Sequence, residues 1–190
     1  MLQLKLFENF SCLEDELVEI QETFSDESVI FFNEKYIGVT YNYDTNNYVS
    51  LMKKIKKFKN IRQVIMGSSN FFNLINYAIE KDFTISELKF VSQISNESVE
   101  FVQEYLEKIN SAEKTEKNQF KEELFKELDW LIYDECIDVE KISILGQFGN
   151  SPIYRYLDLY NNGVITVDEK EVSSVLNEVV LAVVKEQYHV

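Results

Sequence analysis

The spacing of apolar residues changes along this chain, and this change limits its fold class more than any other feature. Leu2, Leu4 and Leu6 alternate with polar residues, which is typical of a half-buried strand. Between residues 120 and 132, apolar residues recur every three or four positions, which is typical of one helix face. Since 45% of the 190 residues are hydrophobic, the chain can bury a sizeable core, as one domain or two small ones. The sequence therefore predicts an α+β protein.

We expect three regions along the chain. Residues 1–68 predict a mixed α/β region, with a first strand, a helix and a β-hairpin that turns at Asn33–Lys35. Residues 69–110 predict three helices, and residues 111–190 predict a helix–hairpin–helix region. The long helix of this last region is expected to bury Phe120, Leu124, Leu128, Leu131 and Ile132, with Phe125 and Trp130 extending the buried face. The closing helix is expected to bury Val172, Val175, Leu176, Val179, Val180 and Val183.

The central region carries the most recognisable pattern. Its first helix places Phe71, Leu74, Ile75, Ala78 and Ile79 on one face. Thr84–Glu87 matches a capping box that would open a second helix, with Ile85, Leu88 and Val91 directed inward. Ser95 can cap a third helix that buries Val99, Val102, Leu106 and Ile109. The motifs T-I-S-E-L, I-S-x-x-x-V and L-E-K-I within residues 70–110 resemble the helix-turn-helix core of winged-helix regulators.

This resemblance implies that the third helix enters the major groove of DNA and contacts bases. The chain departs from the family pattern there. Lys108 is the only basic residue among exposed positions of that helix that include Glu97, Glu100, Glu104 and Glu107. Gln93 replaces the usual glycine of the turn, and no wing follows. Because carboxylates oppose contact with phosphates, we expect a fold that is kept without its DNA function.

Charge is distributed unevenly along the chain. Thirty-three acidic residues against nineteen basic ones give a net charge of −14. The segment 46–65 has no acidic residue, so it carries +6 and the rest of the chain −20. Its Tyr48, Leu51, Met52, Ile55 and Phe58 have helical spacing, so it predicts an amphipathic helix. Its basic face is either simply solvated or contacts a phosphate or an acidic partner through Lys53, Lys54, Lys56, Lys57, Lys59 and Arg62.

The stretch from Asp158 to Glu169 fits three different structures. A calcium loop would place glycine and Glu169 correctly, but Tyr160 would occupy a position that needs an oxygen ligand. A nuclease-like site would use Asp168-Glu169-Lys170 after a strand, with no clear second acidic position. The third interpretation is a hairpin that turns at Asn161–Gly163 and runs into a helix capped by Thr166–Glu169. We favour the hairpin.

The sequence also lacks the residues that most catalytic sites need. Its only histidine, His189, lies next to the last residue, and Cys12 and Cys136 form neither a CxxC pair nor a disulfide framework. No glycine-rich phosphate loop is present. We therefore expect no enzyme, no catalytic residue, no metal site and no cofactor. Without a secretory signal or an apolar run long enough to span a membrane, we expect a cytoplasmic protein.

Two functional hypotheses remain. The first is a non-enzymatic acidic protein that inhibits or sequesters a basic nucleic-acid-handling protein or toxin, by analogy with phage antagonists and immunity proteins. Its binding residues would be Glu97, Glu100, Phe101, Glu104, Tyr105 and Glu107. The second is a transcription regulator that binds DNA through the helix-turn-helix and the lysine-rich segment 46–65. The position of the six basic residues relative to the third helix distinguishes the two hypotheses.

Overall fold

The computed structural model describes residues 2–10, 14–24, 29–42, 45–148, 152–167 and 173–185. They contain helices and an antiparallel sheet, so the predicted α+β class is confirmed. The strands are β1 (Leu2–Asn9), β2 (Val29–Phe31), β3 (Tyr36–Tyr41), β4 (Ile61–Gln63), β5 (Thr84–Phe90), β6 (Val139–Gln147), β7 (Tyr154–Tyr160) and β8 (Val164–Val167). The helices are α1 (Glu14–Thr23), α2 (Thr45–Ile55), α3 (Ser68–Glu80), α4 (Asn96–Ser111), α5 (Lys114–Asp129) and α6 (Ser173–Val183), with a π-helical turn at Trp130–Asp134.

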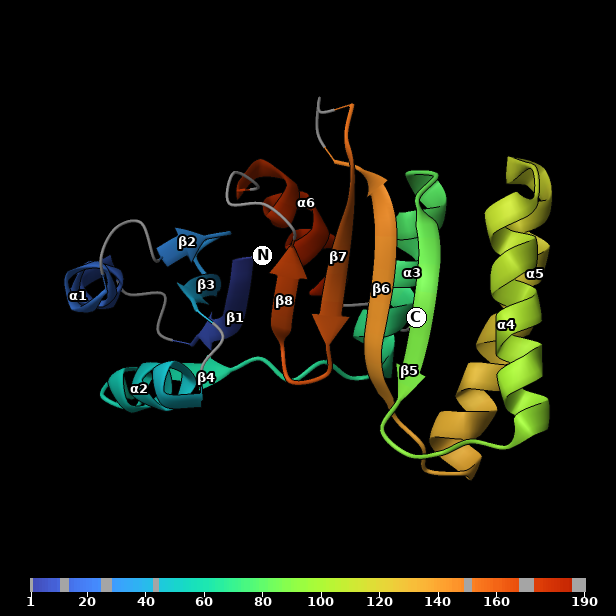
Figure 1. Cartoon of the computed structure of the whole chain (residues 1–190). Helices are drawn as coiled ribbons and strands as arrows, with labels where there is room; N and C mark the ends of the chain where they lie inside the picture. The colour runs from blue at the N-terminus through green and yellow to red at the C-terminus, as the bar shows by residue number, and fades with distance from the viewer. Residues whose placement is uncertain are drawn as a thin grey trace.

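One eight-stranded sheet runs through the molecule in the order β2-β3-β1-β8-β7-β6-β5, with β4 beside β1, and the neighbouring strands among the described residues are antiparallel (Figure 1). On the side away from β3, β1 pairs first with β8 and then, beyond Lys5, with β4. Strands from the beginning, the middle and the end of the chain thus share one sheet.

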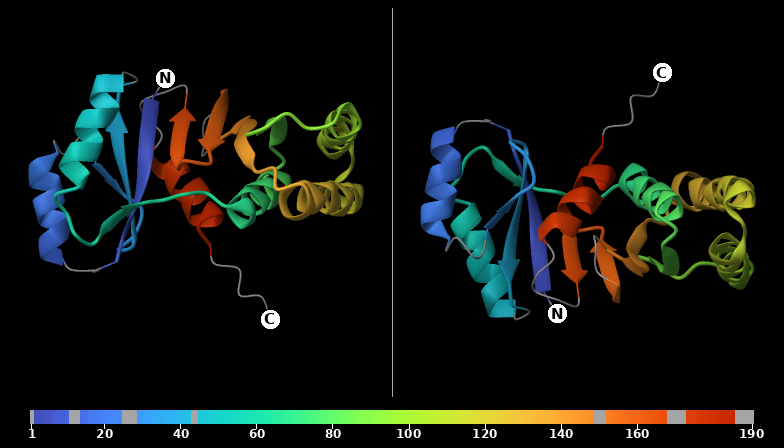
Figure 2. Two further views of the ribbon diagram at one scale, coloured as in Figure 1. Left: turned by 90° about the horizontal axis from the view of Figure 1, so that it is seen from below. Right: turned by 90° about the horizontal axis from the view of Figure 1, so that it is seen from above.

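The helices lie on opposite faces of this sheet. Helices α1 and α2 pack on the part formed by β1, β2 and β3, where Phe7, Ile37 and Leu51 belong to one apolar cluster. Helices α3 and α6 pack on the other face, over β8, β7, β6 and β5, where the larger cluster includes Leu74 and Val180. The α4–α5 hairpin flanks the β5 edge (Figure 2). As a result, no helix of the described residues covers the face of β5–β8 that is opposite α3 and α6 (Figure 1).

The predicted helix that Thr84–Glu87 would open is wrong, because residues 84–90 form the edge strand β5. A β-bulge between Ile85 and Glu87 explains the error. Ile85 pairs with Ile144, and Leu88 pairs with Ile142. Ile85 and Leu88 are three residues apart in β5, whereas their partners in β6 are two residues apart. The extra residue of the bulge lets Ile85 and Leu88 lie on the same face of the sheet. A spacing of three is also helical spacing. The central segment is therefore helix–strand–helix, without the three-helix core of a helix-turn-helix.

The flanking helices of this segment agree with the prediction. Phe71, Leu74, Ile75, Ala78 and Ile79 are buried in α3. The hydroxyl of Ser95 accepts a hydrogen bond from the Ser98 N–H at 3.0 Å and caps α4. Helix α4 buries Val102, Leu106 and Ile109, while Val99 is half-buried.

The other segments were predicted in outline. Helix α2 ends at Ile55, ten residues before the end of the basic segment, although Phe58 is buried as predicted. Helix α5 and the turn after it bury Leu124, Leu128 and Leu131, but Trp130 is 42% exposed and does not extend the core. Helix α6 buries Leu176, Val179, Val180 and Val183, while Val172 and the side chain of Val175 lie outside the described residues.

The favoured structure for the stretch from Asp158 is confirmed up to Val167. Strands β7 and β8 form a hairpin, and Gly163 in its turn has φ +73°. A side chain at this glycine would lie 2.4 Å from the carbonyl oxygen of Val64, so the turn needs glycine for space as well as for conformation. Residues 168–170 of the nuclease-like interpretation lie outside the described residues.

Lys5 fastens this hairpin to the centre of the sheet. Its side chain is fully buried between β8 and β4 and donates hydrogen bonds to the carbonyl oxygens of Asn162 and Val64. Burial lowers the pKa of Lys5 to about 8.

Candidate protein-binding site

The predicted acidic residues form one stripe on α4. Glu97, Glu100, Glu104 and Glu107 are spaced three, four and three residues apart, so at about 100° per residue they point in similar directions. All four are exposed, on the side opposite the buried Val102, Leu106 and Ile109. Within the described part of the chain, Glu104 alone forms an ion pair, at 2.5 Å with Lys108. The stripe therefore presents mostly uncompensated negative charge to solvent.

Aromatic side chains flank this stripe. The rings of Phe101 and Tyr105 stack with centroids 4.3 Å apart, and Tyr105 meets Phe120 of α5 edge-on at 6.3 Å. Lys108 lies 4.4 Å above the centre of the Tyr105 ring. Phe101 and Tyr105 are both half-buried, so they are held in place while part of each ring stays accessible. All six predicted protein-binding residues thus lie on one helix.

Helix α5 adds to the negative charge beside the stripe. Between Asn96 and Asp129 the chain carries ten carboxylates and five lysines. Lys117 is nearly buried and binds Asp82 at 2.5 Å, while Lys126 binds Glu123 at 2.8 Å. Because these lysines are engaged locally, the α4–α5 hairpin is an acidic end of the molecule.

The six predicted basic residues lie at the other end. Lys53 and Lys54 are in the last turn of α2, and the other four lie between α2 and the middle of β4. All six are exposed. Two of them cover aromatic rings, since Lys54 lies 5.2 Å from the centre of Phe24 and Arg62 lies 4.8 Å from that of Phe10. Because α2 packs near β3 and α4 packs on β5, opposite edges of the sheet separate the basic and the acidic residues (Figure 1).

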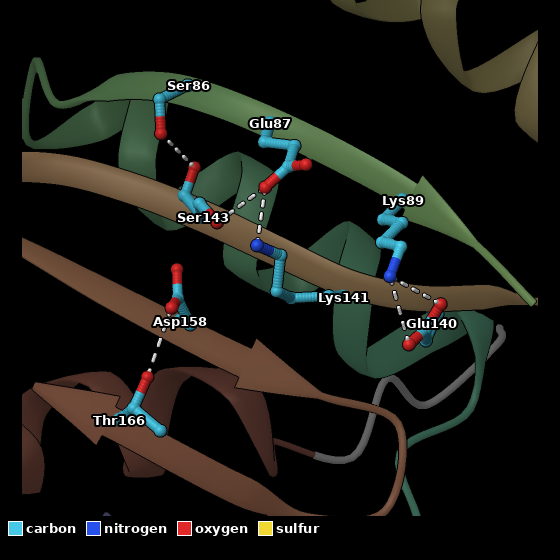
Figure 3. Close-up of polar contacts among 8 residues, drawn as sticks. All are labelled: Ser86, Glu87, Lys89, Glu140, Lys141, Ser143, Asp158 and Thr166. Atoms are coloured by element: carbon cyan, nitrogen blue, oxygen red, sulfur yellow. Dashed lines mark hydrogen bonds and ion pairs between the residues drawn. The ribbon is translucent and has the colours of Figure 1, made fainter.

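Between the two ends, the open face of β5–β8 carries polar side chains that pair with one another (Figure 3). Lys141 contacts Glu87, which also accepts a hydrogen bond from Ser143 at 3.4 Å. The hydrogen bond from Lys141 holds the pKa of Glu87 below its usual value. On the same face, Lys89 pairs with Glu140 at 3.3 Å, and Thr166 donates a hydrogen bond to Asp158 at 3.1 Å. These charges are compensated within the face, so they stabilise the sheet more than they attract a partner.

Sequence reasoning missed a hollow between α3 and α5. Its volume is about 360 Å³, and its lining combines aromatic rings, carboxylates and hydroxyls from Ser68, Ser69, Phe72, Glu122, Phe125, Lys126, Asp129 and Tyr133. Stacked Phe72 and Phe125, with ring centres 4.5 Å apart, join the two helices. The seven-residue spacing of Glu122 and Asp129 places both on one face of α5, but the partner helix lies some fifty residues earlier in the chain.

The described residues include no cluster of three or more histidine, cysteine, aspartate or glutamate side chains that could hold a metal ion. Cys136 is exposed and has a free thiol. Cys12 and His189 lie outside the described residues. No helix among the described residues is long and apolar enough to cross a membrane.

No family model, curated protein or solved structure matches this chain.

Proposed function

We propose that this protein binds a basic protein partner through the acidic stripe of α4 and acts without catalysis, by occupying the partner's cationic surface. A nucleic-acid-binding enzyme or a toxin has a surface of this kind, because its own ligand or target is anionic. The observation that carries the proposal is the stripe itself: four exposed glutamates on one helix face, three of them unpaired within the described residues.

The aromatic flank supports a protein interface. Tight interfaces combine a few anchored aromatic residues with a charged rim, and the charges mainly increase the association rate and select the partner. Phe101 and Tyr105 supply rings that are already packed against each other and against α5. Because these rings are held before binding, less conformational entropy is lost when a partner covers them.

Direct reading of DNA by α4 has less support. The segment before α4 is the strand β5, and the exposed face of α4 is anionic. The lysines and Arg62 lie at the opposite end of the sheet, so they do not add phosphate contacts beside α4. They offer a separate contact for a phosphate or an acidic group.

A pull-down from host lysate with a charge-reversed variant tests the proposal. In the variant, Glu97, Glu100 and Glu104 are each replaced by lysine. Because like charges placed opposite each other cost several kcal/mol, we expect affinity for a basic partner to fall about 100-fold or more. Far-UV circular dichroism should show an unchanged fold, since all three side chains are exposed. Mass spectrometry identifies the protein that is lost.

The matched control replaces Glu19, Glu22 and Glu34 by lysine. These residues are exposed on α1 and on the β2–β3 turn, and the control changes net charge by the same amount. It should retain the partner. Equal retention by both variants would contradict the proposal, as would strong, salt-sensitive binding of the wild-type protein to generic duplex DNA in a gel-shift assay.

A further inference from the structure

We infer that the hollow between α3 and α5 is a binding site for a guanidinium group, and that it receives an arginine side chain of the basic partner. The identity of the natural ligand rests on the proposed function, but the chemistry of the hollow is independent of it. Arginine is the basic side chain that both stacks on aromatic rings and donates parallel hydrogen bonds to carboxylates.

The first argument is the aromatic lining. Phe72 and Phe125 stack against each other in the hollow and are both half-buried. Tyr133 is 68% exposed, and its hydroxyl lies 3.5 Å from the hydroxyl of Ser68, which places it across the hollow from α3. A planar cation stacks favourably on such rings. The volume of about 360 Å³ accommodates one long side chain.

The second argument is the charge balance. Glu122 and Asp129 line the hollow together with one lysine, Lys126, whose ammonium is held by Glu123 at 2.8 Å. Among the described residues, Glu122 forms one long ion pair, at 3.6 Å, with Lys121. Asp129 is exposed, and its side chain forms no hydrogen bond or ion pair in the part of the chain that the structure describes. Partial desolvation raises the pKa of its carboxyl. A guanidinium bound in the hollow would give both carboxylates a cationic partner.

The third argument is the local backbone. Helix α5 continues into a π-helical turn, in which the Glu135 N–H donates to the carbonyl oxygen of Trp130 at 3.1 Å. Such turns are rare and are found frequently at functional sites. This one carries Tyr133 at the rim of the hollow while Leu131 remains in the core. It also holds the only tryptophan of the chain directly after Asp129.

Titration with N-acetyl-L-arginine amide tests the site. The measurements are backbone amide shifts in α3 and α5 and the fluorescence of Trp130. Two control ligands are titrated in parallel. The citrulline analogue has the same shape without the charge. Inorganic phosphate would bind at the N-terminus of α3 instead. We expect shifts at Ser68, Ser69 and residues 122–133 with the arginine probe alone. Binding of the citrulline analogue with equal affinity, or of phosphate instead of arginine, would overturn the inference.

Asp129→Asn keeps the shape of the side chain and removes its charge. It should weaken binding of the arginine probe about tenfold, because a charge-assisted hydrogen bond is lost. Glu116→Gln, an exposed residue in the first turn of the same helix, should leave binding unchanged. Equal binding by all three proteins would exclude the hollow as an arginine site. That result would leave the α4 proposal untouched, because the α4 proposal is tested by whether the charge-reversed variant loses its partner in the pull-down.

Discussion

At the scale of single residues, the buried Lys5 makes the stability of the folded protein depend on pH. Among the described residues its ammonium contacts no anionic group, only the carbonyl oxygens of Val64 and Asn162 and the ring of Phe7, whose centre is 5.9 Å away. The pKa of Lys5 is therefore lower in the folded chain, about 8, than the 10.5 of an unperturbed lysine. The unfolded chain binds more protons between these two values, so folding is opposed most at low pH and stability rises with pH through this window.

We predict that the titration of Lys5 raises the free energy of unfolding by about 2 kcal/mol between pH 8 and pH 10. Denaturant unfolding of the wild-type protein and of Lys5→Met at both pH values measures this, because methionine has a similar shape and does not titrate. The pKa of Tyr77, raised to about 12 mainly by burial and then by Glu178, opposes the effect only above about pH 10. Identical pH dependence in the two proteins would show that Lys5 ionises normally in the folded state.

At the scale of secondary-structure elements, β5 shows how an exposed sheet edge is protected. The side chain of Asn110, at the end of α4, accepts a hydrogen bond from the Ile85 N–H at 3.0 Å and donates one to the Ile85 carbonyl oxygen at 2.9 Å. It thereby occupies backbone groups that a second chain could otherwise pair with. The same interaction fixes α4, and with it the acidic stripe, against the sheet.

Replacing Asn110 by alanine should lower the free energy of unfolding by about 1–3 kcal/mol, because both backbone groups of Ile85 lose their partner. We also expect slow self-association at high concentration, since the edge is opened. Urea unfolding and light scattering measure the two effects. Asn118→Ala, at an exposed position of α5, serves as the control. If both variants unfolded at the same urea concentration, Asn110 would have no such role.

The type of an element could be predicted where its apolar residues kept one spacing from end to end. The prediction failed where that spacing was interrupted. Helix α3 keeps one period and its buried face was predicted, as was the burial of Leu124 and Leu128 in α5. Strand β1 was predicted to be half-buried, but Lys5 and Phe7 on its other face are buried as well as Leu4 and Leu6. In β5 the bulge at Ser86 shifts the spacing of Ile85 and Leu88 to three, so the local pattern is helical although the pairing with β6 is that of a sheet. The partner that decides this, β6, lies more than fifty residues away.

At the scale of the whole molecule, charge is separated along the sheet. Helix α2 and the segment after it, with the exposed lysines and Arg62, lie at one end, and helices α4 and α5, with their carboxylates, lie at the other. The acidic stripe could be predicted because its residues follow one helical period. The hollow beside Asp129 could not, since it exists only where α3 and α5 meet through Phe72 and Phe125. Sites formed within one element are visible in a sequence, whereas sites between elements depend on packing.

The dissociation constant of the partner captured by the wild-type protein, measured as a function of salt concentration, tests whether the α4 glutamates carry the binding. Exposed charges are screened within about 10 Å at 0.1 M salt, so binding through the α4 glutamates should weaken steeply as salt is added. Replacing Glu97 and Glu100 by glutamine should make that dependence shallower, while the same change at Glu19 and Glu22 should not. A dissociation constant that is independent of salt, or one whose salt dependence is the same in both variants, would contradict the account.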